Sequence, residues 1–125
     1  MLNLFWTIAA IMAFFTFVVH TFVGTRFAVA PLRAADEHLP KATIWLNYLC
    51  WHIVTGALFI LAITLFCAAL GRLHPDVVIV SIMLLFCVST VSIISTTKAR
   101  IPFYRFPASY LGGSTALVAS LGFWQ

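Results

Sequence analysis

Charged side chains are scarce in this chain. Only 8% of its 125 residues are Asp, Glu, Lys or Arg, whereas 63% are hydrophobic. A soluble domain typically has about 25% charged residues. A soluble fold of this size could not cover so much apolar surface with so few polar side chains. The composition therefore excludes a soluble globular protein and predicts a chain that is solvated by the lipid bilayer.

The short motifs of common enzyme classes are also missing. The sequence has no H-E-x-x-H, no G-x-S-x-G and no glycine loop that would hold a phosphate. Its cysteines, Cys50, Cys67 and Cys87, form no C-x-x-C pair and are interpreted as small core residues. No Asp or Glu lies inside an apolar run, which disfavours transport built on a membrane carboxylate. These absences favour a protein that is not an enzyme.

Long apolar runs make up most of what is present. They cover residues 4–24, 43–71, 77–97 and 106–124. Each is long enough to cross a hydrocarbon core of about 30 Å as an α-helix, which rises about 1.5 Å per residue. The predicted fold class is therefore all-α: an integral membrane bundle of four antiparallel helices that forms a single domain over residues 1–125.

Proline and charged residues predict the connections between these runs. Pro31, Pro40 and the cluster Asp36-Glu37-His38 indicate a loop after the first run. His74-Pro75-Asp76 predicts a tight turn before the third run, with Asp76 as the N-cap of its helix.

Basic residues collect on one side of the four runs. The first and third connections contain Arg26, Arg33, Lys41, Lys98, Arg100 and Arg105, whereas the second contains only Arg72. The positive-inside rule assigns the side with six basic residues to the cytoplasm, so both termini are expected outside. Basic residues at the ends of spans are topology signals, so we expect no nucleic-acid partner.

Small residues recur at helical spacing in the later runs. They predict close helix packing within the bundle, or dimerisation through one of these faces. The predicted faces are Ser109, Gly113, Ala116 and Ser120 in the fourth run, and Ser81, Leu85, Ser89, Ser92 and Thr96 in the third.

His20 and His52 are the ionisable side chains inside the apolar runs. Each is followed four residues later by a glycine, Gly24 or Gly56. Positions i and i+4 share a face of an α-helix, so we expect room for a flat or bulky group beside each imidazole. Both histidines are expected roughly 10 Å inside the cytoplasmic boundary, where they could face each other across antiparallel helices.

Several interpretations of the two histidines remain open. In one, the imidazoles donate hydrogen bonds to Ser, Thr or Asn across the bundle and only stabilise packing. In another, they ligate haem b from two sides, with Arg26, Arg100 or Arg105 pairing its propionates. A metal ion held by His20 and His52 with Cys50 or Met12 is a third, and a quinone or lipid headgroup is a fourth.

Four short motifs carry a resemblance. His20-x-x-x-Gly24, Pro31-Leu32, Trp51-His52-x-x-Thr55 and the third connection, with Arg100-Ile-Pro102 and Arg105-Phe-Pro107, resemble small four-span inner-membrane proteins of proteobacteria. The resemblance extends over most of the chain. It implies a multi-pass protein of the bacterial inner (cell) membrane and a shared bundle, but it implies no activity.

The predicted function is that of an accessory or structural subunit of a membrane assembly. Its partners would be the lipid bilayer and either other membrane subunits or further copies of itself. One alternative is a redox protein that binds haem b, a metal ion or a quinone through His20 and His52. A second alternative is a small transporter that acts as an oligomer.

Overall fold

The computed structural model describes residues 2–35, 39–102, 104 and 106–125, and the regular elements among them are all helices. They are α1 (Leu4–Val18), the π-helix η1 (Val19–Val29), α2 (Ala30–Ala34), α3 (Lys41–Ala69), α4 (Pro75–Lys98), α5 (Ala108–Leu121) and the 3-10 helix η3 (Gly122–Trp124). Because α1, η1 and α2 follow one another without a break, the described residues form four main helical segments. The all-α prediction is confirmed.

Three of these segments are long and apolar enough to cross a membrane. They are Leu4–Ala34, Lys41–Ala69 and Pro75–Lys98. The fourth, α5, covers only 14 residues, or about 21 Å. It begins after Pro107 and changes to the 3-10 helix η3 at Gly122. A fourth crossing therefore remains a prediction.

The first segment is ten residues longer than the run that predicted it. Instead of ending at Gly24, it continues through η1 and α2 to Ala34. Pro31 is tolerated because it lies in the first turn of α2. The helix returns there from π-helical to α-helical geometry, and the missing N–H of proline destabilises a helix least in its first turn. The predicted loop is correspondingly shorter, and its residues Asp36, Glu37 and His38 lie outside the described residues.

The turn between α3 and α4 has two defined caps. At the end of α3, Gly71 has a φ of 69°, and Arg72 N–H donates to the Cys67 carbonyl. This is a Schellman motif, which glycine favours because it lacks a Cβ. At the start of α4, His74 is the N-cap, and its Nδ1 accepts from the Asp76 N–H at 3.4 Å. The prediction of Asp76 as the N-cap was wrong; its carboxylate lies in the first helical turn.

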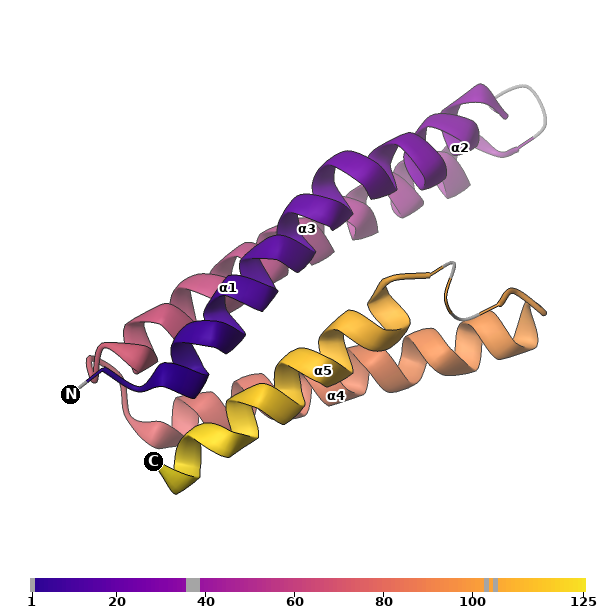
Figure 1. Ribbon diagram of the computed structural model, residues 1–125. Coiled ribbons are helices and arrows are strands. Elements are labelled where there is room, and N and C mark those ends of the chain that lie inside the picture. Colours follow the sequence, from indigo (N-terminus) through magenta and orange to yellow (C-terminus); the bar gives the residue numbers. More distant parts are fainter. Residues whose placement is uncertain (1, 36–38, 103, 105) are drawn as a thin grey trace.

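The helices form two antiparallel hairpins, one of α1–η1–α2 with α3 and the other of α4 with α5 (Figure 1). The hairpins meet at the end that carries both termini, here called the junction end, and diverge toward the other end, the open end. The buried core lies in the junction half. It consists of Trp6, Ala9, Ala10, Ala13, Leu61, Ala62, Leu65, Ala68, Ala69, Val78, Leu85, Ala116 and Ala119.

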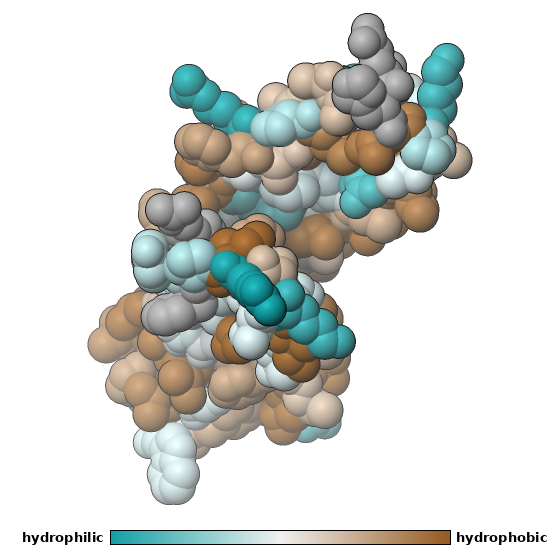
Figure 2. Space-filling model, turned by 90° about the vertical axis from the view of Figure 1, so that its right-hand side faces the viewer, coloured by the Kyte–Doolittle hydropathy of each residue, from teal (hydrophilic) through white to brown (hydrophobic). Residues whose placement is uncertain are grey.

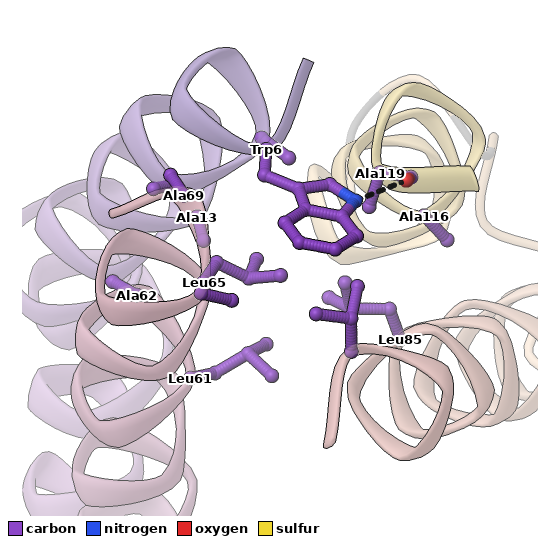
Figure 3. Close-up of a cluster of buried hydrophobic side chains, with 13 residues drawn as sticks. Trp6, Ala13, Leu61, Ala62, Leu65, Ala69, Leu85, Ala116 and Ala119 are labelled. Carbon is purple, nitrogen blue, oxygen red and sulfur yellow. Dashed lines mark hydrogen bonds between the residues drawn. The ribbon is translucent and has the colours of Figure 1, made fainter. Parts of the chain in front are cut away.

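Alanines make up more than half of this core, and small side chains allow helix backbones to approach closely. The large exception is Trp6, whose indole lies between the hairpins, near Leu65 on one side and Leu85 on the other (Figure 3). Its Nε1–H donates to the Ala119 carbonyl at 3.0 Å. A Cβ placed on Gly122 would overlap the Trp6 ring, so the close approach of η3 depends on that glycine.

Asn3 joins three helix ends at this junction. Its Oδ1 accepts from the Trp6 N–H at 3.0 Å and caps α1. Its backbone N–H donates to the Ala69 carbonyl at 3.0 Å, and its Nδ2 donates to the Gly122 carbonyl at 2.7 Å. These carbonyls lie at helix C-termini, where an intrahelical partner is lacking. We call these contacts, with that of Trp6, the terminal junction.

Arg100 adopts a backbone conformation that glycine normally occupies. It follows the end of α4 with a φ of 55°, and Ile101 N–H donates to the Thr96 carbonyl at 2.9 Å. This is the same motif as at Gly71, but with a side chain in the left-handed region. Such a conformation costs about 1–2 kcal/mol for a residue with a Cβ.

Replacing Trp6 by Phe should weaken the bundle. The ring remains but the hydrogen bond to Ala119 is lost, so the free energy of unfolding should fall by about 1 kcal/mol. Titration with sodium dodecyl sulfate in mixed micelles measures this quantity. Trp124→Phe is the control, because the Trp124 side chain is 90% exposed. Equal effects of the two substitutions would contradict a specific role for Trp6.

Arg100→Gly should raise the free energy of unfolding, by up to about 1 kcal/mol, because glycine relieves the left-handed strain. Arg100→Ala removes the same charge without relieving the strain, and should not stabilise. The same detergent titration compares them. If both variants gained stability equally, the charge and not the backbone conformation would be responsible.

Candidate functional site

His20 is held against α3 by an aromatic stack. The half-buried imidazole lies in η1, and its centroid is 4.0 Å from the ring of Trp51 with an interplanar angle of 15°. Its Nε2 lies 3.5 Å from the Trp51 carbonyl oxygen, at the long limit of a hydrogen bond. The contact between the two helices at this level is therefore built mainly from ring stacking.

The π-helical geometry of η1 brings two further residues onto Trp51. In an i→i+5 helix, residues four and five positions apart both lie about one turn from each other. Thr25 Oγ1 accepts from Trp51 Nε1 at 3.2 Å. A Cβ added to Gly24 would lie 2.7 Å from the edge of the same indole. The room expected beside His20 is thus already filled by Trp51.

The surroundings of His52 are different. Its ring is exposed and meets the Tyr48 ring edge to face, with centroids 4.3 Å apart. It makes no hydrogen bond to any residue that the structure describes. Gly56, one turn further along α3, has no atom within 4 Å of an added Cβ. The room predicted beside the histidine is present here.

Each imidazole is therefore engaged by an aromatic neighbour and not by the other imidazole. Among residues 2–35, 39–102, 104 and 106–125, no group of three or more His, Cys, Asp or Glu side chains could hold a metal ion. Of the predicted propionate partners, Arg26 is exposed on η1, Arg100 follows α4, and Arg105 lies outside the described residues. Ligation of haem b or a metal by His20 and His52 remains a prediction.

The serines of α4 belong to a separate contact, between α4 and α5. All five residues of the predicted α4 face are buried. Ser89 Oγ donates to the Ser109 carbonyl at 2.7 Å, and Ser92 Oγ lies 2.9 Å from Ser109 Oγ. A Cβ on Gly112 would be 3.2 Å from the Leu85 carbonyl oxygen. These hydroxyls therefore serve helix packing within the second hairpin.

Arg33 and Tyr48 form a contact that the sequence did not reveal. The Arg33 guanidinium carbon lies 5.1 Å from the centroid of the Tyr48 ring. This distance is typical of a cation–π interaction. The i, i+4 spacing of Tyr48 and His52 could have indicated their contact. The contact between Arg33 and Tyr48 could not be found, because the first helix was expected to end at Gly24, nine residues before Arg33.

Comparison with known protein families, with curated proteins and with solved structures finds no match for this chain. The resemblance to small four-span inner-membrane proteins accordingly remains a prediction, and the two hairpins have to be interpreted from their own geometry.

The two histidine-linked glycines should respond in opposite ways to substitution by alanine. Gly24→Ala places a methyl group against Trp51, so the indole or the helix must move, and the free energy of unfolding should fall by about 1–3 kcal/mol. Gly56→Ala meets open space and should be neutral or slightly stabilising, because alanine favours a helix. Detergent titration measures both variants. A loss of stability in Gly56→Ala equal to that in Gly24→Ala would contradict this arrangement.

Proposed function

We propose that the protein is an accessory subunit of a membrane assembly, and that it binds a transmembrane helix of another subunit between the open ends of its hairpins. One face of α3 supports this proposal. Ala68, Leu61, Val54 and Asn47 recur every seven residues and so lie on one side of the helix. Ala68 is 1% exposed and Leu61 5%, but Val54 is 41% exposed.

The face of α3 that carries Leu61 and Val54 becomes exposed where the hairpins separate. Leu61 still belongs to the core that both hairpins share, and Figure 3 shows its side chain pointing from α3 toward the helix that carries Leu85. Two turns further toward the open end, Val54 has lost that cover. Figure 2 looks onto the open end and shows the hairpins as two lobes joined by a narrow waist. The face of α3 that is buried in the core at the junction end is therefore exposed toward the open end.

Asn47 favours a protein helix over lipid as the occupant. Its side chain is exposed, and its Nδ2 donates to the Thr43 carbonyl of its own helix. The amide oxygen accepts no hydrogen bond from a described residue. Asparagine amides hold membrane helices together by such bonds, whereas acyl chains supply no donor. Beside it, Ala28, Val29, Leu32 and Trp51 complete a cavity of about 270 Å³ that would receive a side chain of the partner.

The orientation belongs to the same proposal. Arg26, Arg33, Lys41, Lys98 and Arg100 lie toward the open end, and Arg72 lies in the turn at the junction end. By the positive-inside rule, the open end faces the cytoplasm of a bacterial inner membrane and the termini lie in the periplasm. Helices α5 and η3 then make the fourth crossing, and local thinning of the bilayer accommodates their short length.

A photoreactive amino acid at position 54 should capture the partner helix in living cells. The expected result is one discrete adduct from position 54, with the crosslinked peptide identified by mass spectrometry, and none from position 60. Ile60 is the matched control because it is 65% exposed on another face of α3. Asn47→Leu should reduce the adduct at position 54.

Three outcomes would contradict the proposal. Adducts with lipid only would show that no protein helix lies between the hairpins. Equal capture at positions 54 and 60 would show that the opening has no specific occupant. A crosslink between two copies of this chain would show that the protein associates with itself and not with a helix of another subunit.

A further inference from the structure

The first hairpin has a second surface, on the side of α3 that faces away from Val54. His52 and Val54 point to nearly opposite sides, because successive residues of an α-helix are rotated by about 100°. On the His52 side, Tyr48, His52 and Gly56 follow one another at intervals of four residues. Phe59 and Ile63 continue the same face toward the junction end. We call this surface the Gly56 face.

The end of the Gly56 face near α2 is basic and aromatic. The Arg33 guanidinium lies over Tyr48, as described above, and the ring of Tyr48 also meets those of Trp45 and His52 edge to face. Trp45 is exposed, as are the side chains of Arg33 and His52. An exposed tryptophan and arginine beside a half-buried tyrosine, at one level of the first hairpin, are typical of the region of the lipid headgroups.

The other end of the Gly56 face is an apolar groove between α1 and α3. It has a volume of about 300 Å³, and its walls include Ile11 and Phe14 of α1 and Phe59, Ile63 and Phe66 of α3. Gly56 lies between this groove and His52, and no atom would come within 4 Å of a Cβ at that position. Because Gly56 has no side chain, the surface of α3 between the basic end and the groove has open space at this position.

We propose that the Gly56 face binds one anionic phospholipid of the bilayer, with its phosphate at Arg33 and one acyl chain lying over Gly56 in the apolar groove. The separation fits this ligand, because Tyr48 and Phe59 are eleven residues, or about 16 Å, apart along α3. That distance lies within the length of one fatty acyl chain.

The charge of the basic end selects the headgroup. A guanidinium presents several N–H donors in a planar fork that matches phosphate oxygens. It favours a phospholipid with a net negative charge over a zwitterionic one, whose own ammonium group competes for the phosphate. Basic pockets between membrane helices on the cytoplasmic side are known recognition sites for anionic headgroups. The imidazole of His52 adds a polar group at the level of the glycerol esters.

The test is a competition for the purified full-length chain in mild detergent. Equal amounts of dioleoylphosphatidylglycerol and dioleoylphosphatidylcholine are added, and native mass spectrometry counts the lipids that each chain retains. The wild type should retain one phosphatidylglycerol in about fivefold preference over phosphatidylcholine. Arg33→Gln should bring that preference close to one. Arg72→Gln, which removes a basic residue at the junction end, should leave the preference unchanged.

Gly56→Leu tests the acyl-chain path separately from the charge. The leucine projects into open space and so should not disturb folding, but it fills the space that the proposal assigns to the acyl chain. Retention of both lipids should fall while the remaining preference for phosphatidylglycerol persists. Equal retention of the two lipids by the wild type would overturn the proposal. Equal losses of preference in Arg33→Gln and Arg72→Gln, or unchanged retention in Gly56→Leu, would overturn it as well.

Discussion

The arrangement of the four helices depends on the terminal junction, where Asn3 caps the start of α1 and, together with Trp6, binds the C-terminal ends of α3 and α5. A membrane supplies no hydrophobic force between helices, so contacts of this kind and close packing of small residues must hold the hairpins together. Asn3 caps its own helix and donates to the Ala69 and Gly122 carbonyls, while Trp6 reaches Ala119. Because the alanine-rich core lies in the same half, the described residues join the hairpins at the junction end.

The two hairpins are held internally by different chemistry. In the first, the open half depends on aromatic contacts: Trp51 stacks on His20 and bonds to Thr25. In the second, the hydroxyl groups of Ser89 and Ser92 form hydrogen bonds with Ser109, and Gly112 packs closely against the backbone of α4. Neither set extends to the other hairpin. These side chains of the open half therefore stabilise each pair of helices and not the contact between the two hairpins.

Sequence reasoning predicted the elements better than their contacts. Apolar runs identified the three helices that are long enough to span a membrane and placed five of their six ends within two residues. Crossing a bilayer requires a length of apolar sequence that can be read directly from the chain. The end of the first helix was misplaced, since neither the glycine at position 24 nor Pro31 breaks a helix that passes through a π-helical segment. The serine face of α4 was predicted correctly from its spacing.

The two histidine-linked glycines show why the candidate site was only half predictable. Both have the same local pattern, but Trp51 fills the space at Gly24 and nothing fills it at Gly56. The difference depends on how the neighbouring helix is rotated about its axis. The few residues around each glycine do not determine that rotation. Asn3 was missed for the same reason, because its partners Ala69 and Gly122 are on other helices.

The long sequence separation across the terminal junction has a consequence for biosynthesis. Trp6 bonds to a residue 113 positions later, and Asn3 to one 119 positions later. The first hairpin can form its own contacts as soon as α3 has been inserted, but its N-terminal end stays without these partners until η3 has left the ribosome. Assembly of the bundle is therefore completed only after translation of its last helix. Until then, the nascent first hairpin offers its alanine face to any membrane chaperone or neighbouring helix.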